Sequence, residues 1–299
     1  EFPDEQWVYV YYTAGDQGSK ENRVARFDVG ANDPASSEEV LVDGIPAANI
    51  HNGGRLRFGP DENLWVCCGD AGEGVNAQDL SSLGGKILRI SPAGKAPSSN
   101  PELGGDRRIF TYGHRNPQGI SFLPDGTPIV TEHGPSNRDE VMVLRPGANY
   151  GWGPEDQRAR DAETYPGTDY ARPVVNTGPD EGWAPSGCVF YTGDRVPSWS
   201  NRLLVGGLVS QRVNLVTVYP ADGEPASTEN GGMRYDADWM NEAYDAVAHH
   251  TLENELGRVR HVEQGPNGEV YAITSNRDGR AREGFPREGD DRLVRLTRA

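Results

Sequence analysis

Residues 120–130 read Ile120-Ser121-Phe122-Leu123-Pro124-Asp125-Gly126-Thr127-Pro128-Ile129-Val130, and this pattern is the main indication of the fold class. Two short apolar runs flank a Pro-Asp-Gly tripeptide. Proline fixes one backbone φ at a turn value and glycine accepts a positive φ, so the tripeptide is typical of a tight turn between antiparallel strands. The stretch therefore predicts a β-hairpin.

The same pattern of apolar strand, turn and second apolar strand begins again near Gly54 and Val259, and a degenerate copy begins at Cys188. The copies recur roughly every 65 to 75 residues, with further short strands such as 86–90 between them. Such spacing favours radial repetition of four-stranded antiparallel sheets, so we predict one all-β domain over 1–299, a β-propeller. A β-sandwich is the second choice, because its strands would be spaced more evenly.

Two stretches interrupt the repeat and predict long loops, at about 150–183 and about 221–257. The second is acidic and contains 239–247, whose apolar residues lie at possible helical spacing. Long loops in compact folds are often functional, although acidic insertions also serve as surface bulk.

The charge of the chain is strongly acidic, with 29 Lys and Arg against 45 Asp and Glu and a net charge of -16. Such a surface disfavours nucleic acid and anionic lipid as partners. The only lysines are Lys20, Lys86 and Lys95. Acid excess with so little lysine predicts a halophilic source, and an ordinary acidic secreted protein is the alternative.

The chain begins at Glu1 and enters a predicted strand by Trp7, so either a leader and more have been removed or the sequence is a fragment. No run of 18 apolar residues occurs, and no membrane insertion is predicted. The three cysteines, Cys67, Cys68 and Cys188, are too few for a disulfide framework. Small buried side chains are the simplest interpretation of them, and a strained 67–68 disulfide is the alternative.

His51 is a candidate general base, because it precedes the flexible run Asn52-Gly53-Gly54 and Asp70 follows at the end of the next predicted strand. A carboxylate beside a histidine raises its basicity and fixes its tautomer. A purely structural histidine is the alternative.

Three further segments carry polar chemistry. Residues 113–119 place a dense group of polar side chains in a turn, which is costly to build without a ligand. Residues 132–140 offer carboxylates and carbonyls suited to a hard cation, without the spacing of an EF-hand. Arg258 and Arg260 alternate along one predicted strand and could bind an anion, or pair with the abundant acidic residues.

Taken together, these segments resemble the soluble quinoprotein glucose and aldose sugar dehydrogenases of the glucose/sorbosone dehydrogenase family. The resemblance extends from about Trp7 to the C-terminus. It rests on the motifs His51-Asn52-Gly53-Gly54-Arg55-Leu56, Gly69-Asp70-Ala71-Gly72, Leu83-Gly84-Gly85-Lys86-Ile87-Leu88-Arg89, Gly113-His114-Arg115-Asn116-Pro117-Gln118-Gly119, Glu132-His133-Gly134-Pro135, Gly147-Ala148-Asn149-Tyr150-Gly151-Trp152, Ala184-Pro185-Ser186-Gly187 and Gly257-Arg258-Val259-Arg260.

The resemblance implies a six-bladed propeller that holds pyrroloquinoline quinone (PQQ). Relatives carry a further blade's worth of sequence before the position of Glu1, so the N-terminal blade is expected to be missing or incomplete. By position, His51 resembles the family's base and Asp70 its partner, and Arg115 resembles a group that stabilises charge on the reacting quinone carbonyl, with Asn116 beside it.

The resemblance also implies the remaining cofactor and metal ligands. Arg258 and Arg260 would pair with the carboxylates of the quinone. The backbone carbonyls of Gly134 and Pro135 would hold a calcium ion that binds the quinone, and Glu140 with the carbonyl of Tyr150 resembles a second, structural calcium site.

Two positions depart from the family pattern. A basic cofactor contact is replaced by Val209, so that contact is lost or passes to Arg212. A glutamine follows the Asp70 loop in relatives, and Gln78 is the nearest candidate here.

The expected activity is oxidation of the anomeric carbon of an aldose to a lactone, with hydride transfer to PQQ and reoxidation by an external electron acceptor. The alternatives are a related sorbosone, aldehyde or polyol dehydrogenase and a non-catalytic carbohydrate-binding propeller. Because relatives are exported, the chain is expected to be extracellular or periplasmic.

Overall fold

The structure, a computed structural model, describes residues 6–16, 18–153, 170–282 and 284–297. Within these residues the chain is all-β, with one short helix, α1 (Gly74–Gln78), and the 3-10 turns η1 (Pro34–Ser37) and η3 (Pro197–Trp199). Two compact units can be separated, and each is described by itself. Unit 1 comprises Glu1–Pro117 with Arg145–Arg158, and unit 2 comprises Gln118–Leu144 with Ala159–Ala299.

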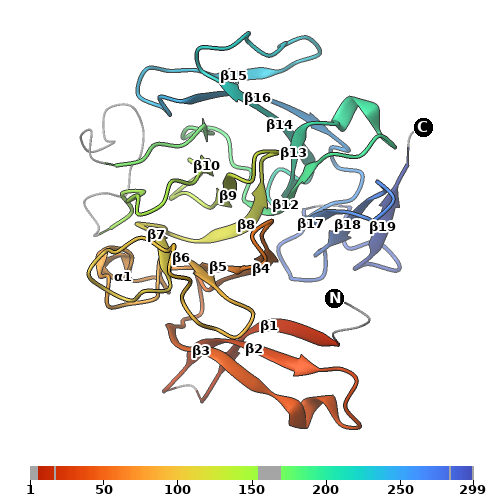
Figure 1. Ribbon diagram of the computed structural model, residues 1–299. Coiled ribbons are helices and arrows are strands. Elements are labelled where there is room, and N and C mark those ends of the chain that lie inside the picture. Colours follow the sequence, from red (N-terminus) through yellow and green to blue (C-terminus); the bar gives the residue numbers. More distant parts are fainter. Residues whose placement is uncertain (1–5, 17, 154–169, 283, 298–299) are drawn as a thin grey trace. The chain divides into compact units, whose positions relative to one another are not determined.

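Unit 1 contains two antiparallel sheets (Figure 1). The first has the order β1-β2-β3, and the second has the order β4-β5-β6-β7. Their strands are β1 (Trp7–Ala14), β2 (Glu21–Asp28), β3 (Glu39–Pro46), β4 (Gly53–Phe58), β5 (Leu64–Cys68), β6 (Lys86–Ile90) and β7 (Ile109–Tyr112). A core between them includes Val24, Ile45, Val66 and Leu88, which are almost wholly buried.

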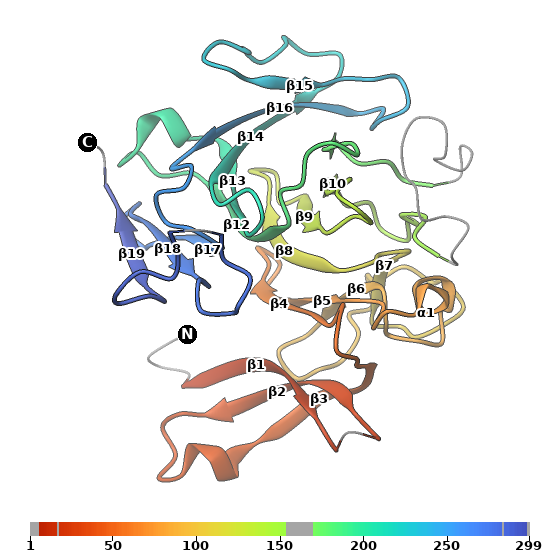
Figure 2. The ribbon, with the colours of Figure 1, turned by 180° about the vertical axis from the view of Figure 1, so that it is seen from behind.

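The sheets of unit 2 have the orders β11-β10-β9-β8, β12-β13-β14-β16-β15 and β17-β18-β19, and can be followed from both sides (Figure 1 and Figure 2). Their strands are β8 (Pro117–Phe122), β9 (Pro128–Glu132), β10 (Glu140–Val143), β11 (Val175–Asn176), β12 (Pro185–Tyr191), β13 (Arg202–Gly207), β14 (Val213–Pro220), β15 (Met233–Tyr235), β16 (Tyr244–Thr251), β17 (Val259–Gln264), β18 (Val270–Thr274) and β19 (Leu293–Leu296). Two apolar cores lie between neighbouring sheets of this unit.

The four repeat copies of the sequence correspond to four pairs of adjacent strands, β4-β5, β8-β9, β12-β13 and β17-β18. Each pair forms the first two strands of its sheet. The predicted turns are present, since the N–H of Gly126 donates to the carbonyl of Leu123 at 2.9 Å and that of Gly268 donates to Gly265 at 3.0 Å. The prediction of an all-β chain built from repeated antiparallel hairpins is confirmed.

Other details of the fold differ from the expectation. The sheets of the described residues have three, four or five strands rather than a uniform four. The predicted loop 221–257 contains β15 and β16, and no helix covers 239–247. Instead, β16 pairs with β14 over eight residues, and its apolar residues Ala246 and Val247 are buried. Strand pairing thus overrides the helical spacing of the apolar residues in 239–247. The six-bladed ring, its incomplete first blade and the single-domain organisation stay predictions.

The predicted loop 150–183 lies partly outside the described residues, and its described part contains only the short strand β11. Cys67, Cys68 and Cys188 are buried thiols, as the simpler interpretation predicted. Among the described residues, no helix is long and apolar enough to cross a membrane.

Candidate active site

His51 lies in the connection between β3 and β4, with its backbone in the left-handed region at φ 56°. This conformation is uncommon for a non-glycine residue and marks a site where the surroundings hold the chain. The carbonyl of His51 accepts a hydrogen bond from the N–H of Ala71 at 3.0 Å. Its imidazole Nδ1 lies 2.8 Å from Oδ1 of Asp70.

Asp70 follows β5 and is 1% exposed, whereas the His51 side chain is 16% exposed. Its Oδ1 also accepts the N–H of Gly72 at 2.8 Å, and its Oδ2 accepts Nε1–H of Trp152 at 2.7 Å. An ionised carboxylate can only accept hydrogen bonds, so the contact between His51 Nδ1 and Asp70 Oδ1 places the ring proton of a neutral His51 on Nδ1. The lone pair is then on Nε2, where a base needs it.

Gly69 allows this close approach of the two loops. A Cβ added at Gly69 would lie 1.9 Å from the carbonyl oxygen of His51 and 3.0 Å from the nitrogen of Gly53. No side chain fits in that space, so glycine is required where the end of β5 passes beneath the His51 loop.

Arg115 and Asn116 lie between β7 and β8 and join the same group. The carbonyl of Arg115 accepts the N–H of Asp70 at 2.8 Å, and Oδ1 of Asn116 accepts the N–H of Gly53 at 3.2 Å. The guanidinium carbon of Arg115 lies 5.3 Å from the ring centroid of Trp152, a cation–π distance. Unit 1 therefore brings together four candidate residues from separate sequence motifs, namely His51, Asp70, Arg115 and Asn116.

Gln78 ends α1 and exchanges side-chain hydrogen bonds with Asn149, at 3.0 and 2.7 Å. It also donates to the carbonyl of Trp152. Sequence reasoning assigned Trp152 no role, although it ends the Gly-Ala-Asn-Tyr-Gly-Trp motif. In this structure Gln78 anchors the segment that carries Trp152, and its predicted contact with the cofactor stays a prediction.

The loop 133–139 in unit 2 carries the proposed calcium ligands Gly134 and Pro135. Its residues Ser136, Asn137 and Arg138 all have positive φ, which folds the chain tightly. A Cβ at Gly134 would lie 2.0 Å from the Arg138 carbonyl oxygen and 2.4 Å from that of Asn137, so backbone oxygens crowd this point.

Asp139 anchors this loop. It is 4% exposed, and its carboxylate accepts the backbone N–H groups of Gly134, Trp183 and Ala184 at 2.7–3.1 Å. Sequence reasoning did not single it out, although it lies in the polar run 132–140. Within the described part of the chain, no group of three or more His, Cys, Asp or Glu side chains is placed to hold a metal ion.

Glu140 and Tyr150 were predicted to share a second calcium ion. Glu140 is buried in unit 2 and accepts a hydrogen bond from Asn176 at 3.1 Å. Tyr150 belongs to unit 1, where its ring stacks on His114 with centroids 4.9 Å apart and its hydroxyl accepts the N–H of Arg145. Burial raises the pKa of the Tyr150 hydroxyl. The shared site stays a prediction.

Arg258 and Arg260 both approach one carboxylate, that of Asp278. Arg258, which immediately precedes β17, is 5% exposed and donates to Asp278 Oδ2 at 2.8 Å and to the carbonyl of Leu208 at 3.0 Å. Arg260 Nη2 lies 3.8 Å from the same oxygen. Burial opposes ionisation of Asp278, but hydrogen bonds from Arg258 and from the backbone of Arg280 lower its pKa below the usual range. The two guanidinium groups thus converge on Asp278.

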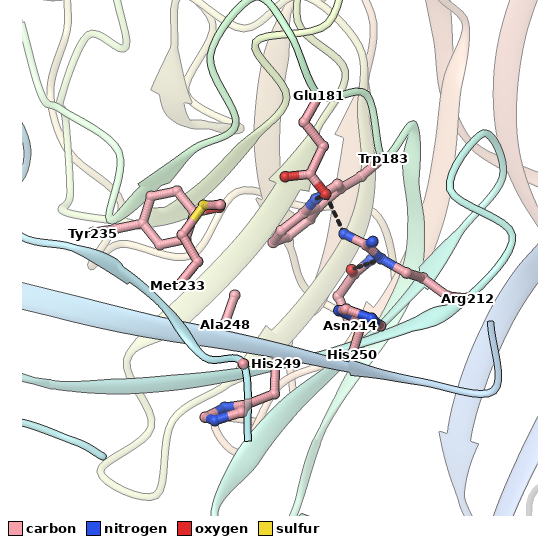
Figure 3. Close-up of a pocket in the computed structure, with 10 residues that line it drawn as sticks. Glu181, Trp183, Arg212, Asn214, Met233, Tyr235, Ala248, His249 and His250 are labelled. Atoms are coloured by element: carbon pink, nitrogen blue, oxygen red, sulfur yellow. Dashed lines mark hydrogen bonds and ion pairs between the residues drawn. The ribbon is translucent and has the colours of Figure 1, made fainter. Parts of the chain in front are cut away.

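Arg212 lies elsewhere in unit 2, in an ion pair with Glu181, and donates to Oδ1 of Asn214 at 2.8 Å (Figure 3). It lines a pocket of about 110 Å³ whose other lining residues are Glu181, Trp183, Asn214, Gly231, Met233, Tyr235, Ala248, His249 and His250. Glu181 already neutralises Arg212, while Val209 is 40% exposed. Cofactor binding by Arg212 therefore stays a prediction.

The sequence model of a family described as glucose/sorbosone dehydrogenase matches residues 1–283. This chain belongs to that family. The chain is 32% identical to an uncharacterized protein of Synechocystis over 93% of its own length and 66% of the relative's. It is 31% identical to aldose sugar dehydrogenase YliI of Escherichia coli over 79% of this chain and 60% of the relative. The chain thus matches less than two thirds of each of these relatives.

The structure is also similar to that of the PQQ-bound form of aldose sugar dehydrogenase from Streptomyces coelicolor. The two chains superpose with a TM-score of 0.77 at 30% sequence identity, over 99% of this chain and 77% of the other. Family membership, expected from the motifs, is therefore confirmed.

Proposed function

We propose that this chain is a PQQ- and calcium-dependent dehydrogenase that oxidises the anomeric carbon of aldose sugars to lactones. The observation that carries the proposal is the buried contact between His51 Nδ1 and Asp70, which leaves Nε2 available as a base. Membership of the family and the similarity to a PQQ-bound aldose sugar dehydrogenase support the same conclusion. We also propose export to the periplasm or the medium and a halophilic source, on the resemblance and the charge alone.

The residues of this chain fit a cofactor that carries carboxylates. Arg258 and Arg260 both approach Asp278, and guanidinium groups suit the carboxylates of such a cofactor. Arg115 and Asn116, beside the His51–Asp70 pair, would donate to the cofactor's reacting oxygens. When bound, PQQ supplies the acceptor for a hydride.

We propose that a calcium ion would be held in the loop 133–139 by backbone oxygens rather than by an acidic cluster. Calcium accepts carbonyl oxygens as ligands, and the carbonyl oxygens of Asn137 and Arg138 lie close to Gly134 in this loop. The carbonyls of Gly134 and Pro135 would hold the ion, and Asp139 would keep the loop in shape through three backbone N–H groups. When bound, the ion supplies Lewis-acid polarisation.

The residues of the chain would take up the proton and stabilise the charges that develop. His51 Nε2 would take the proton of the anomeric hydroxyl while the hydrogen on the anomeric carbon leaves as hydride, with the electron pair of the C–H bond, to the acceptor that PQQ would supply. The carbon is thereby oxidised by two electrons. Asp70 holds the imidazole and stabilises its positive charge once it is protonated. Arg115 donates toward the negative charge that develops on the acceptor.

The first test is calorimetric titration of PQQ into the calcium-loaded protein in high salt, with a chelator control, followed by turnover of a panel of aldoses with an artificial electron acceptor. We expect calcium-dependent binding and oxidation of several aldoses. Binding without turnover would favour a non-catalytic carbohydrate-binding protein, and oxidation only of aldehydes or polyols would favour the related dehydrogenases.

The base is tested by His51→Gln, which removes the ring nitrogen that takes the proton. We expect kcat to fall by about 100- to 10,000-fold, as loss of a general base typically does, while PQQ affinity changes little. His250→Gln is the control, because His250 is an exposed histidine on β16 that lines the Arg212 pocket but has no proposed part in proton transfer. Unchanged turnover in His51→Gln would disprove the assignment.

A further inference from the structure

The hydrogen bond from Trp152 to Asp70 is the starting point, because it connects the proposed base pair to a residue without an assigned role. The indole Nε1 lies 2.7 Å from Asp70 Oδ2, and Trp152 is 6% exposed. We propose that Trp152 is a positioning residue that fixes the tautomer of His51 by holding the Asp70 carboxylate.

The two oxygens of Asp70 have different partners. Oδ1 faces His51 Nδ1 and the N–H of Gly72, while Oδ2 faces the indole N–H of Trp152. Because Asp70 is 1% exposed, bulk water does not readily replace a lost donor. Without the indole N–H, a carboxylate that turns to satisfy Oδ2 weakens its hold on Nδ1. His51 is then free to place its proton on Nε2, the wrong nitrogen for a base.

Trp152 is itself held by its neighbours in unit 1. Its backbone N–H donates to the carbonyl of Gly113 at 2.9 Å, and its carbonyl accepts from Gln78. Gln78 is fixed in turn by its reciprocal amide contacts with Asn149. The indole ring also lies under the guanidinium of Arg115. One side chain thus contacts both the partner of the base and the arginine expected to stabilise charge.

The direct test reads the tautomer of His51 in the protein without cofactor, by long-range nitrogen–proton NMR at a pH where free imidazole is neutral. His51→Gln assigns the resonance. We expect a proton on Nδ1 in the wild type and a mixture of tautomers in Trp152→Phe, which keeps the ring but lacks the N–H.

The matched control is Trp65→Phe. Trp65 is 3% exposed, and its indole donates to another carboxylate of unit 1, Asp61, at 3.3 Å. It should leave the His51 tautomer unchanged. An unchanged tautomer in Trp152→Phe overturns the proposal, and so does an equal change in Trp65→Phe.

A second variant covers the case in which Trp152→Phe does not fold. Asp70→Asn replaces the acceptor and should shift the indole N–H resonance of Trp152. An indole resonance that does not respond would show that the two side chains are not coupled, and the proposal would fail.

The kinetic test rests on the proposed function. Trp152→Phe should lower kcat about 10- to 100-fold, the range for a lost hydrogen bond to a charged group, and leave KM for the sugar little changed. If Trp152 acts through Asp70, adding Trp152→Phe to Asp70→Asn should cost little more. Additive losses would contradict the proposal. A wild type without turnover would refute the proposed function, while the tautomer measurement would still decide the role of Trp152.

Discussion

At the scale of single residues, a buried lysine whose ammonium donates to backbone carbonyls supports the site of unit 1. Lys86, at the start of β6, is fully buried, and its ammonium donates to the carbonyls of Asn76, Ala77 and Gly84 at 2.6–3.2 Å. Asn76 and Ala77 belong to α1, the helix that carries Gln78. Lys86 thus fastens the element that anchors Trp152.

Lys86 leads to a prediction of pH dependence. Burial lowers the pKa of Lys86 to about 8, although the nearby Cys68 and Asp79 oppose this shift. Between pH 8 and 9 the unfolded chain still holds this proton and the folded chain has begun to lose it, so the contribution of Lys86 to the free energy of unfolding should rise with pH. The increase is at most about 1.4 kcal/mol per pH unit for one proton.

Urea unfolding at pH 7, 8 and 9, with Lys86→Met as the control, measures this effect. The variant lacks the titrating group, so the wild type should gain stability relative to it across this range. A relative loss of stability would contradict the prediction. The Cys68 thiol contributes in the opposite direction from about pH 8 upward, because burial raises its folded pKa to about 12 while the thiol of the unfolded chain already ionises there. The variant keeps Cys68, so the comparison with Lys86→Met isolates the contribution of Lys86.

At the scale of elements, short connections between strands place the proposed catalytic groups. His51 precedes β4, Asp70 follows β5, and Arg115 lies between β7 and β8. The N–H of Gly85 donates to the carbonyl of Gly69, and the N–H of His114 donates to Gly85. These loops are therefore bonded through their backbones, and the sheet acts as a scaffold for them.

Gly69→Ala tests this scaffold. The methyl group would collide with the His51 carbonyl. We therefore expect a loss of stability of about 2 kcal/mol or more and a large fall in turnover. Thermal unfolding and kcat measure the two effects. Gly18→Ala is the control, because a Cβ there meets nothing within 4 Å. A Gly69→Ala variant as stable and active as the control would contradict the packing described.

At the scale of the whole molecule, the dominant feature is the net charge of -16. Repulsion within a compact acidic chain opposes folding, and salt reduces it. An ion pair such as Arg108–Asp106 neutralises one acidic residue with one basic residue. Because acidic residues outnumber basic ones by 45 to 29, pairing leaves a net negative charge. Stability should therefore depend on ionic strength.

Raising NaCl from 0.1 to 1 M shortens the screening length from about 10 to about 3 Å. We expect Tm to increase over this range and to do so equally with KCl. Sucrose at matched osmolality is the control, because it stabilises proteins without screening charge. A Tm that falls with salt, or that follows sucrose alone, would contradict the electrostatic interpretation.

Sequence patterns determined the repeated hairpins, because Pro-Asp-Gly and Pro-Asn-Gly turns between apolar strands act over a few neighbouring residues. Sequence motifs also indicated the family and the candidate site residues His51, Asp70, Arg115 and Asn116. The contacts of these side chains depend on the tertiary structure, because Trp152 reaches Asp70 across 82 positions of the chain and Asp278 reaches Arg258 across 20. Local periodicity likewise could not reveal β16, whose strand form depends on pairing with β14. Contacts between residues distant in sequence depend on how the strands pack, and the pattern of neighbouring residues does little to predict that packing.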